Sequence, residues 1–270
     1  MDKAVIIGVF DFVNFHVCKA LLNKGIEVKG VQIETEENGD LLVEKRLEIG
    51  RNANLSVISI GELTDDHNQK GTMVLSVYDL YMQYREDFLL SEDIKKPFMN
   101  FNNWEKIVIL APSQLVTNEN ITDAGVIMQN FMKGIKSLTN NIQFLYLPTI
   151  YGPWQPDTFM FQHSILNEWN GEGTFRGLRE EITDALFVED AVASIIEIVE
   201  KNSSGRYLLQ SGKNNQWERC AAFLGIGDHI SNQSTKELVD NEINKLTVKS
   251  IIPLPDALTK QIEHTHRVYI

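Results

Sequence analysis

Short apolar runs alternate with amphipathic stretches along the first part of the chain. The β-branched run Val5–Ile7 ends at Gly8, as a buried parallel strand does where it reaches a turn. Apolar residues recur at helical spacing between positions 13 and 21, and Gly25 follows where a helix would end. The alternating range 26–31 then predicts a second strand. Together these residues predict one strand–helix–strand unit.

Four later apolar runs extend this rhythm and predict further strands, at 55–60, 73–77, 106–110 and 142–147. A helical apolar face over residues 125–138 separates the last two of them. Alternation of strands and helices is typical of α/β proteins in which helices cover both faces of a parallel sheet. The sequence therefore predicts an α/β fold with a doubly wound parallel sheet of the Rossmann type.

The texture of the sequence changes after Tyr151, where Gly, Pro, Trp and Asn become frequent and the strand–helix rhythm weakens. We therefore expect a Rossmann-type domain over residues 1–150 and a smaller, substrate-type lobe over residues 151–270. A helix is predicted at 191–201 and is expected to pack back on the first domain. Asp190 lies just before this helix and is expected to cap its free N–H groups.

Composition and charge narrow the classes of partner. Hydrophobic residues make up 43% of the 270 residues, enough for a full core. The net charge of -12 opposes binding to nucleic acid or to an anionic membrane. Two cysteines, and no Cys/His group with zinc spacing, predict no metal site. No apolar run is long enough to span a membrane and no signal segment is recognisable, so a cytoplasmic location is expected.

Four segments carry a family resemblance. The range 5–32 reads as strand, glycine turn, helix and strand, and Gly-Glu-Leu stands at 61–63. Residues 147–154 read Leu-Pro-Thr-Ile-Tyr-Gly-Pro-Trp, and residues 184–192 read Asp-Ala-Leu-Phe-Val-Glu-Asp-Ala-Val. In order and spacing these segments resemble the extended short-chain dehydrogenase/reductase family, nearest to its nucleotide-sugar 4-epimerases. The resemblance implies a Rossmann fold, an NAD(P) cleft and a C-terminal lobe for a nucleotide sugar.

The glycine loop departs from the family pattern, whose three glycines fall on Gly8, Asp11 and Asn14. The second and third glycines normally let backbone N–H groups approach the pyrophosphate and let helix and strand pack closely. A carboxylate at Asp11 would repel a phosphate ~4 Å away by about 4 kcal/mol at an effective dielectric of 20. Alternatively, Asp11 simply caps the next helix. The family's ribose-binding acid falls on Gln32, and Glu62 stands in the segment similar to the family's "GDL".

The positions expected to carry catalysis hold substituted residues. The family's tyrosine and lysine fall near Asn120 and Ala124, and neither side chain acts as an acid or base at neutral pH. The family's serine or threonine falls on Ser113 or, equally, on Pro112, and Ser113 could be only a turn residue. Tyr151 is the nearest other phenol and either lines the cleft or packs in its turn. Arg176 or Arg179 could meet a substrate phosphate, but solvated surface positions are favoured for both.

We interpret the chain as a degenerate NAD-dependent epimerase/dehydratase-like protein that lacks Tyr/Lys catalysis and acts as a binding or regulatory protein. The alternative is an active NAD(P)-dependent nucleotide-sugar epimerase or dehydratase with substituted catalytic residues. No cofactor is predicted, and NAD(P) would be used only if the family function is retained. A nucleotide sugar or other small molecule is the expected ligand. The resemblance implies a homodimer through a helix pair that includes residues 125–138.

Overall fold

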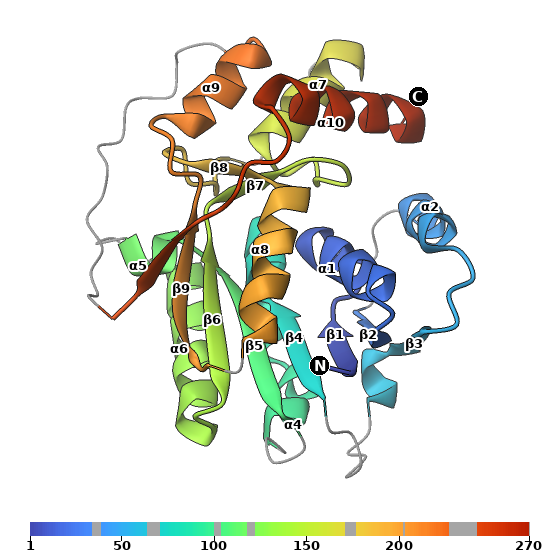
Figure 1. The fold of residues 1–270 in the computed structure, drawn as a ribbon, viewed down its shortest axis with the longest axis vertical. Coiled ribbons are helices and arrows are strands. Elements are labelled where there is room, and N and C mark those ends of the chain that lie inside the picture. Colours follow the sequence, from blue (N-terminus) through green and yellow to red (C-terminus); the bar gives the residue numbers. More distant parts are fainter. Residues whose placement is uncertain are drawn as a thin grey trace.

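The computed structural model describes residues 1–33, 39–63, 71–99, 104–117, 122–170, 177–201, 203–226 and 242–269 (Figure 1). A sheet of eight parallel strands forms its centre, in the order β10-β9-β6-β5-β4-β1-β2-β3. These strands are β1 (Lys3–Ile7), β2 (Glu27–Gln32), β3 (Leu55–Ser59), β4 (Thr72–Ser76), β5 (Lys106–Pro112), β6 (Ile142–Leu147), β9 (Gly205–Gln210) and β10 (Asn244–Thr247). The doubly wound parallel sheet predicted from the sequence is confirmed.

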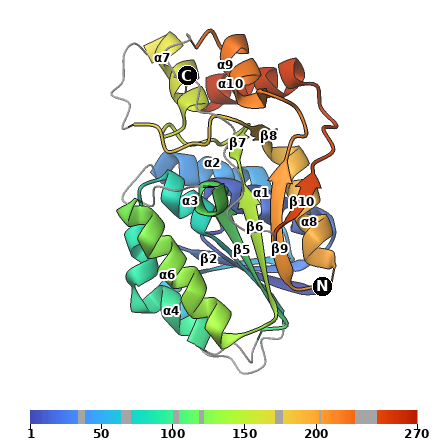
Figure 2. The same ribbon diagram turned by 90° about the vertical axis from the view of Figure 1, so that its left-hand side faces the viewer.

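Helices cover both faces of this sheet (Figure 2). One layer consists of α1 (Phe12–Asn23) and α8 (Val188–Glu200), and the other of α4 (Glu92–Met99) and α6 (Asp123–Leu138). The connections carry α2 (Gly39–Ile49), α3 (Val77–Met82), α5 (Gln114–Thr117) and the 3-10 helices Ile60–Glu62 and Glu86–Leu90. A smaller part lies beyond the carboxyl ends of the strands and contains α7 (Met160–Asn170), α9 (Gln216–Phe223), α10 (Leu254–Tyr269) and the paired strands β7 (Thr149–Tyr151) and β8 (Ala185–Phe187).

Strand β1 shows how the sheet fills both layers. Ala4 and Ile6 belong to the apolar core on the side of α1 and α8, whereas Val5 and Ile7 belong to the core on the side of α4 and α6. All four side chains are at most 1% exposed. Because both faces are covered, the strand reads as a continuous apolar run, as buried parallel strands do.

The order of the sheet reverses between β1 and β4. From β1 the chain proceeds to β2 and β3 on one side, and then returns to place β4 on the other side, so that Ile7 pairs with both Val31 and Leu75. In open α/β sheets, ligands bind outside the carboxyl ends of the strands at such a point. Gly8 follows β1 here, and Asp79 lies three residues after the end of β4.

The chain beyond residue 150 contributes to both parts of the molecule. Strands β9 and β10 extend the main sheet beside β6, and α8 packs against α1. The division at residue 150 therefore stays a prediction, and the main sheet takes two strands from beyond it. The expected cap by Asp190 is wrong, because α8 already begins at Val188 and Phe187 is its N-cap residue. Asp190 instead accepts a hydrogen bond from the N–H of Ile251 at 3.2 Å.

A buried amide network ties α10 to the turn after β7. Gln261 Nε2 donates to Oε1 of Gln155 at 2.7 Å and to Oε1 of Gln162 at 2.9 Å. Gln162 in turn donates to Thr265 at 3.1 Å, and Gln155 donates to the carbonyl of Ile150 at 2.7 Å. All four side chains of the network are buried. A donor or acceptor left without a partner at such a site costs about 1–3 kcal/mol.

Candidate functional site

Gly8 forms the turn between β1 and α1 at the switch point of the sheet. Its φ of +77° lies in the left-handed region, which glycine adopts without strain. The N–H groups of Gly8 and Val9 donate to the carbonyl of Val31 at 2.9 and 3.2 Å, and this fixes the loop against β2. A Cβ atom on Gly8 would collide with the carboxylate of Asp11. The first glycine of the pattern is therefore required by its own loop.

A carboxylate from another segment occupies the N-terminus of α1. Asp79 accepts the N–H of Val13 with both oxygens at 3.1 Å and the N–H of Asn14 with Oδ2 at 3.2 Å. Asp11 holds the N-cap position but makes no cap bond with its side chain, so the alternative that Asp11 caps this helix is wrong. Burial, followed by the nearby charge of Asp11, raises the pKa of Asp79 to about 7.

Asp11 forms an ion pair instead of a cap. Its Oδ1 accepts a hydrogen bond from Nη1 of Arg85 at 3.0 Å, and the two side chains are only 12% and 19% exposed. Nη2 of Arg85 is buried and has no hydrogen-bond partner among the described residues. The pair compensates the charge that the sequence places in the glycine loop. The carboxylate still lies against Gly8, where the resemblance implies a pyrophosphate.

Asn14 takes the position of the third glycine and is fully buried. Its Nδ2 donates to the carbonyl of Ile7 at 2.8 Å. The side chain that was expected to crowd a tight contact thus connects the first turn of α1 to the end of β1. A close glycine contact is replaced by an amide that belongs to the core.

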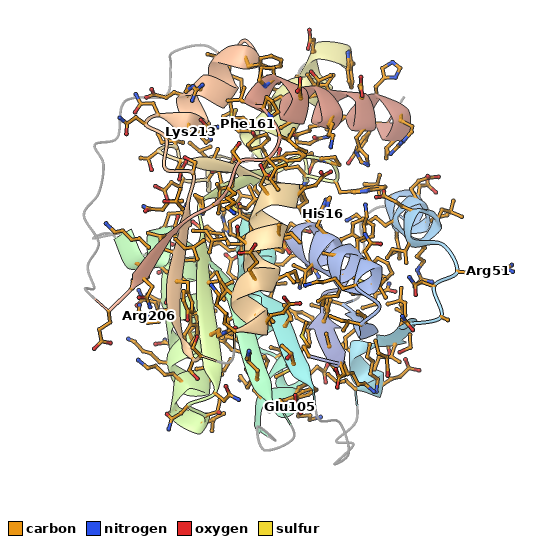
Figure 3. The ribbon with its side chains drawn as sticks, in the orientation of Figure 1. His16, Arg51, Glu105, Phe161, Arg206 and Lys213 are labelled. Carbon is orange, nitrogen blue, oxygen red and sulfur yellow. The ribbon has the colours of Figure 1, made fainter. Side chains whose placement is uncertain are left out.

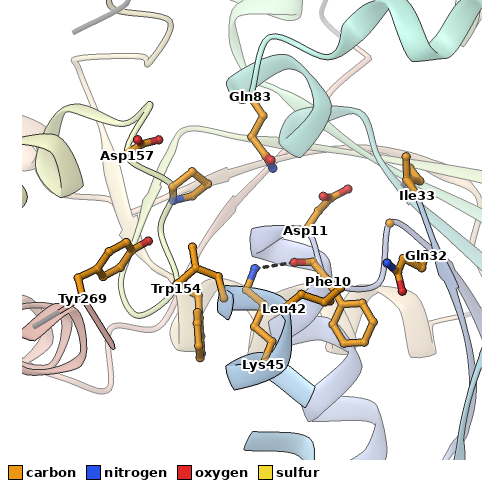
Figure 4. Close-up of a pocket in the computed structure, with 13 residues that line it drawn as sticks. Phe10, Asp11, Gln32, Ile33, Leu42, Lys45, Gln83, Trp154, Asp157 and Tyr269 are labelled. Carbon is orange, nitrogen blue, oxygen red and sulfur yellow. Dashed lines mark hydrogen bonds between the residues drawn. The ribbon is translucent and has the colours of Figure 1, made fainter. Parts of the chain in front are cut away.

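A cavity of about 140 Å³ opens beside the glycine loop, between α2 and the turn after β7 (Figure 4). Its polar lining residues are Asp11, Gln32, Lys45, Gln83, Asp157 and Tyr269. Lys45 Nζ donates to the carbonyl of Phe10 at 2.6 Å and lies 5.5 Å from the ring centre of Trp154. Burial lowers the pKa of Lys45 although nearby carboxylates act in the opposite sense. Small-molecule sites commonly enclose about 300–1,000 Å³, so the described lining suits a fragment smaller than a dinucleotide.

The two remaining cofactor positions lie apart. Gln32 lines the cavity, and its Oε1 accepts a hydrogen bond from Nη2 of Arg46 at 2.7 Å. Arg46 also lies over the ring of Phe10 at 5.3 Å. Glu62 accepts hydrogen bonds from the N–H and the hydroxyl of Ser59 at 2.7 and 3.0 Å and does not line the cavity. Of these two positions, the structure brings only Gln32 to the glycine loop.

The turn after β7 is held down on α1 and α2. Nε2 of His16 donates to the carbonyl of Pro153 at 2.9 Å, and Nε1 of Trp154 donates to Oε2 of Glu48 at 2.6 Å. Figure 3 shows His16 on α1, below the helices of the smaller part. Burial lowers the pKa of His16 to about 3, so its imidazole is neutral and donates one hydrogen bond. This histidine has a structural role.

Ser113 lies directly after β5 and is 1% exposed. Its hydroxyl bonds one carboxylate oxygen of Glu181, and the hydroxyl of Thr183 bonds the other. Thr149 donates to the backbone carbonyl of Glu181 at 2.5 Å. From the sequence Ser113 has no evident partner, and the fold supplies one from 68 residues away. The hydroxyl at this position is therefore paired with a carboxylate.

The other catalytic positions carry no accessible acid or base. Tyr151 is 2% exposed and packs between the rings of Phe161 and Phe187, at 6.0 and 5.8 Å. Burial, and then the thiol of Cys220, raises the pKa of its phenol far above the ordinary value. Ala124 lies in the first turn of α6, and Asn120 lies outside the described residues.

Arg179 is not the solvated surface charge that was favoured from the sequence. Its two terminal nitrogens donate to the two carboxylate oxygens of Glu86 at 2.7 and 2.9 Å. Nη1 also donates to the carbonyl of Tyr81 at 2.6 Å, and the guanidinium lies 3.7 Å from the ring centre of Tyr84. The planar guanidinium fits this bidentate and stacked arrangement, which explains why the residue is held in place.

The pyrophosphate of a dinucleotide does not fit this loop as it is arranged. Two N–H groups at the start of α1 already donate to Asp79, and the carboxylate of Asp11 lies against Gly8. Asp79, Arg85 and Lys45 were not predicted from the sequence as residues of this site. One signal was available for Asp79, because an acid just after a strand that neighbours β1 must lie at the same edge of the sheet.

Two other kinds of site are not found in the part of the chain that the structure describes. Within it, no group of three or more His, Cys, Asp or Glu side chains is placed to hold a metal ion. No helix of these same ranges is long and apolar enough to cross a membrane.

No protein-family model and no curated protein matches the chain. Among solved structures, it is similar to UDP-glucuronic acid 4-epimerase from Bacillus cereus in complex with UDP-glucuronic acid and NAD, with a TM-score of 0.70, 14% identity, and 99% of this chain and 100% of that chain covered. It is also similar to UDP-N-acetylglucosamine 4-epimerase from Methanobrevibacter ruminantium, with a TM-score of 0.65, 16% identity and 98% of both chains covered. At this identity the similarity establishes the fold, which is that of NAD-dependent UDP-sugar 4-epimerases.

Proposed function

We propose that this chain, which has the fold of UDP-sugar 4-epimerases, is a binding or regulatory protein without their hydride-transfer chemistry. The proposal rests on the absence of a usable acid or base at Ala124 and Tyr151, two positions where proton transfer could be expected. Ala124 has no ionisable group, and the phenol of Tyr151 is sealed among aromatic rings with a raised pKa. A missing general base alone removes roughly 10²–10⁴-fold of rate. The filled glycine loop agrees with this reading.

The ligand that we propose is a nucleotide sugar or another small molecule bound beyond the carboxyl ends of the strands. Similar solved structures are complexes with UDP-glucuronic acid, and the present chain keeps the Tyr-Gly-Pro-Trp turn beside that region. We further propose a homodimer through α6 and a cytoplasmic location.

An isotope-exchange assay tests the absence of catalysis. The purified chain is incubated with UDP-glucose, UDP-galactose or UDP-glucuronate and added NAD, and exchange at the sugar carbons is followed. We expect no exchange above a buffer blank. In parallel, a thermal shift titration with the same sugars tests binding, because a ligand of the native state must raise the melting temperature. Exchange above the blank would remove the first proposal, and no shift with any UDP-sugar would remove the proposed ligand.

One observation favours an active enzyme as the second candidate. The hydroxyl of Ser113 is bonded to the carboxylate of Glu181, which could accept its proton. If this pair replaces the family's acid and base, exchange would be found and would be lost in both Ser113→Ala and Glu181→Gln. Thr183→Val, which removes only the second hydroxyl on Glu181, is the matched control and should retain most of the exchange.

A further inference from the structure

We infer that the carboxylates of Asp79 and Asp11 are an internal replacement for the two phosphates of a dinucleotide, and that they close the cofactor site of this fold with the chain's own side chains. This inference rests on the proposed function, because it explains how the cofactor site is kept closed in a protein without hydride-transfer chemistry. It concerns the loop between β1 and α1 and the residues that follow β4.

The start of α1 carries backbone N–H donors that could bind an anion. The N-terminus of a helix binds anions because its first N–H groups have no partner within the helix and the helix dipole favours negative charge. Here the N–H groups of Val13 and Asn14 donate to Asp79, which is 1% exposed. A buried acid from a segment 66 residues away thus takes the role of the anion.

The loop also carries charged side chains of both signs. Asp11 and Asp79 supply two carboxylates, as a diphosphate bridge supplies two anionic groups. Arg85 pairs with Asp11, and the charge of Lys45 interacts favourably with both acids. Cations of the chain itself therefore lie near both acids without any ligand. An incoming phosphate would have to displace one carboxylate and leave a buried charge uncompensated, which is strongly unfavourable.

One donor near the loop is still unused. Nη2 of Arg85 is buried without a partner among the described residues, while Nη1 holds Asp11. Removal of both carboxylates would free the guanidinium of Arg85 from Asp11 and the two N–H groups of α1 from Asp79. The closed loop is in this sense a latent anion site.

Restoring the family's glycines is the simplest way to try to open the loop, and we expect it to fail. Replacing Asp11 and Asn14 by glycine would restore the family's glycine pattern, but Asp79 would still occupy the N–H groups of α1. We therefore expect Asp11→Gly/Asn14→Gly to bind inorganic pyrophosphate no better than the wild-type chain. The double variant Asp11→Asn/Asp79→Ala should bind it at least about tenfold more tightly than Asp11→Asn alone, because only the double variant frees the helix N–H groups.

Calorimetric titration of the full chain with inorganic pyrophosphate tests this, with sodium chloride at matched ionic strength as the salt control. Asp11→Asn/Asp79→Asn is the matched variant, since its amide oxygen keeps an acceptor at α1 and should bind less than the alanine variant. Wild-type binding as tight as that of the double variant, or a folded double variant that gains nothing, would overturn the inference.

If the double variant fails to fold, hydrogen exchange of the wild-type chain decides the question. The N–H groups of Val13 and Asn14 should exchange slowly, and their NMR signals should move with the titration of Asp79. Fast exchange at both would also overturn the inference. Turnover of UDP-sugars, in contrast, would remove the proposed function and leave this result to be judged separately.

Discussion

The indole N–H of Trp154 and the carboxylate of Glu48 meet at 2.6 Å and join the turn after β7 to α2. Lys19 of α1 bonds the other oxygen of the same carboxylate. On its other side, the ring of Trp154 lies 4.4 Å from the ring of His264 in α10. Trp154 thus connects elements from both ends of the chain, next to the cavity at the glycine loop.

Glu48→Gln should lower stability and change its dependence on pH. Burial acts to raise the pKa of Glu48, but hydrogen bonds from Lys19 and Trp154 outweigh it and hold the pKa below the ordinary value. Stabilisation by a carboxylate of this kind is present above its unfolded pKa and is lost as the pH falls through the folded value. We expect a loss of about 1 kcal/mol near neutral pH and a flatter profile below it. Urea denaturation at several pH values measures this, with the exposed Glu44→Gln as a control that should leave both unchanged.

Asn14→Gly should destabilise the chain although it restores a family glycine. The change removes a buried hydrogen bond to Ile7, worth about 1 kcal/mol, and replaces asparagine by glycine in a helix at a cost of roughly 0.3 kcal/mol. We therefore expect the free energy of unfolding to fall by about 1–1.5 kcal/mol. Asn23→Gly makes the same change at the exposed end of α1 and should have a much smaller effect. Equal losses in the two variants would contradict the assigned role of Asn14.

His16→Gln should reduce the sensitivity of the fold to acid. Because the folded pKa of His16 is about 3 and the ordinary value is 6.5, the unfolded chain binds a proton over this range and the folded chain does not. Stability contributed by the neutral imidazole is thus lost as the pH falls from about 6.5 toward 3. Glutamine keeps a donor for the carbonyl of Pro153 but cannot titrate. Melting temperatures between pH 7.5 and 4 should fall less steeply than in wild type, whereas His266→Gln on the exposed face of α10 should leave the slope unchanged.

The Arg179–Glu86 pair should show a measurable coupling energy. Lysine at position 179 can neither bond both oxygens of Glu86 nor stack on Tyr84. A double-mutant cycle with Arg179→Lys and Glu86→Gln is expected to give about 1–2 kcal/mol, more than an exposed pair because both side chains are largely covered. The exposed pair Lys95–Glu92 provides the comparison and should give a coupling close to zero. A coupling energy of zero for both pairs would mean that Arg179 behaves as a solvated surface charge.

Local pattern was sufficient to predict six of the eight described strands of the sheet, whereas β9 and β10 were not predicted. Val5–Ile7 and 106–110 are apolar on every residue because both faces of their strands are covered, and this signal is contained within a few neighbouring positions. The order of the strands, and with it the reversal between β1 and β4, was known only from the structure. The start of α8 was misplaced because Asp190 is a good cap residue by type, while the true boundary depends on Phe187, which packs in the core.

The content of the candidate site could be predicted only in part. The family resemblance assigned Gly8, Asp11 and Gln32 to one cofactor site, and all three line the cavity. It could not supply the partners of Asp11 and Ser113, because Arg85 and Glu181 come from segments 74 and 68 residues away. Whether the charge of Asp11 repels a ligand or is neutralised within the chain depends on such partners. The amino-acid composition does not identify them.

The amide network of Gln155, Gln162, Gln261 and Thr265 has a consequence for synthesis on the ribosome. Gln261 and Thr265 lie in α10, which follows every described strand of the sheet along the chain. Until α10 has been made, Gln261 cannot donate to Gln155, and the turn that carries Trp154 is not fastened from above. A growing chain can therefore make the described strands of its sheet before the roof over the glycine loop is complete.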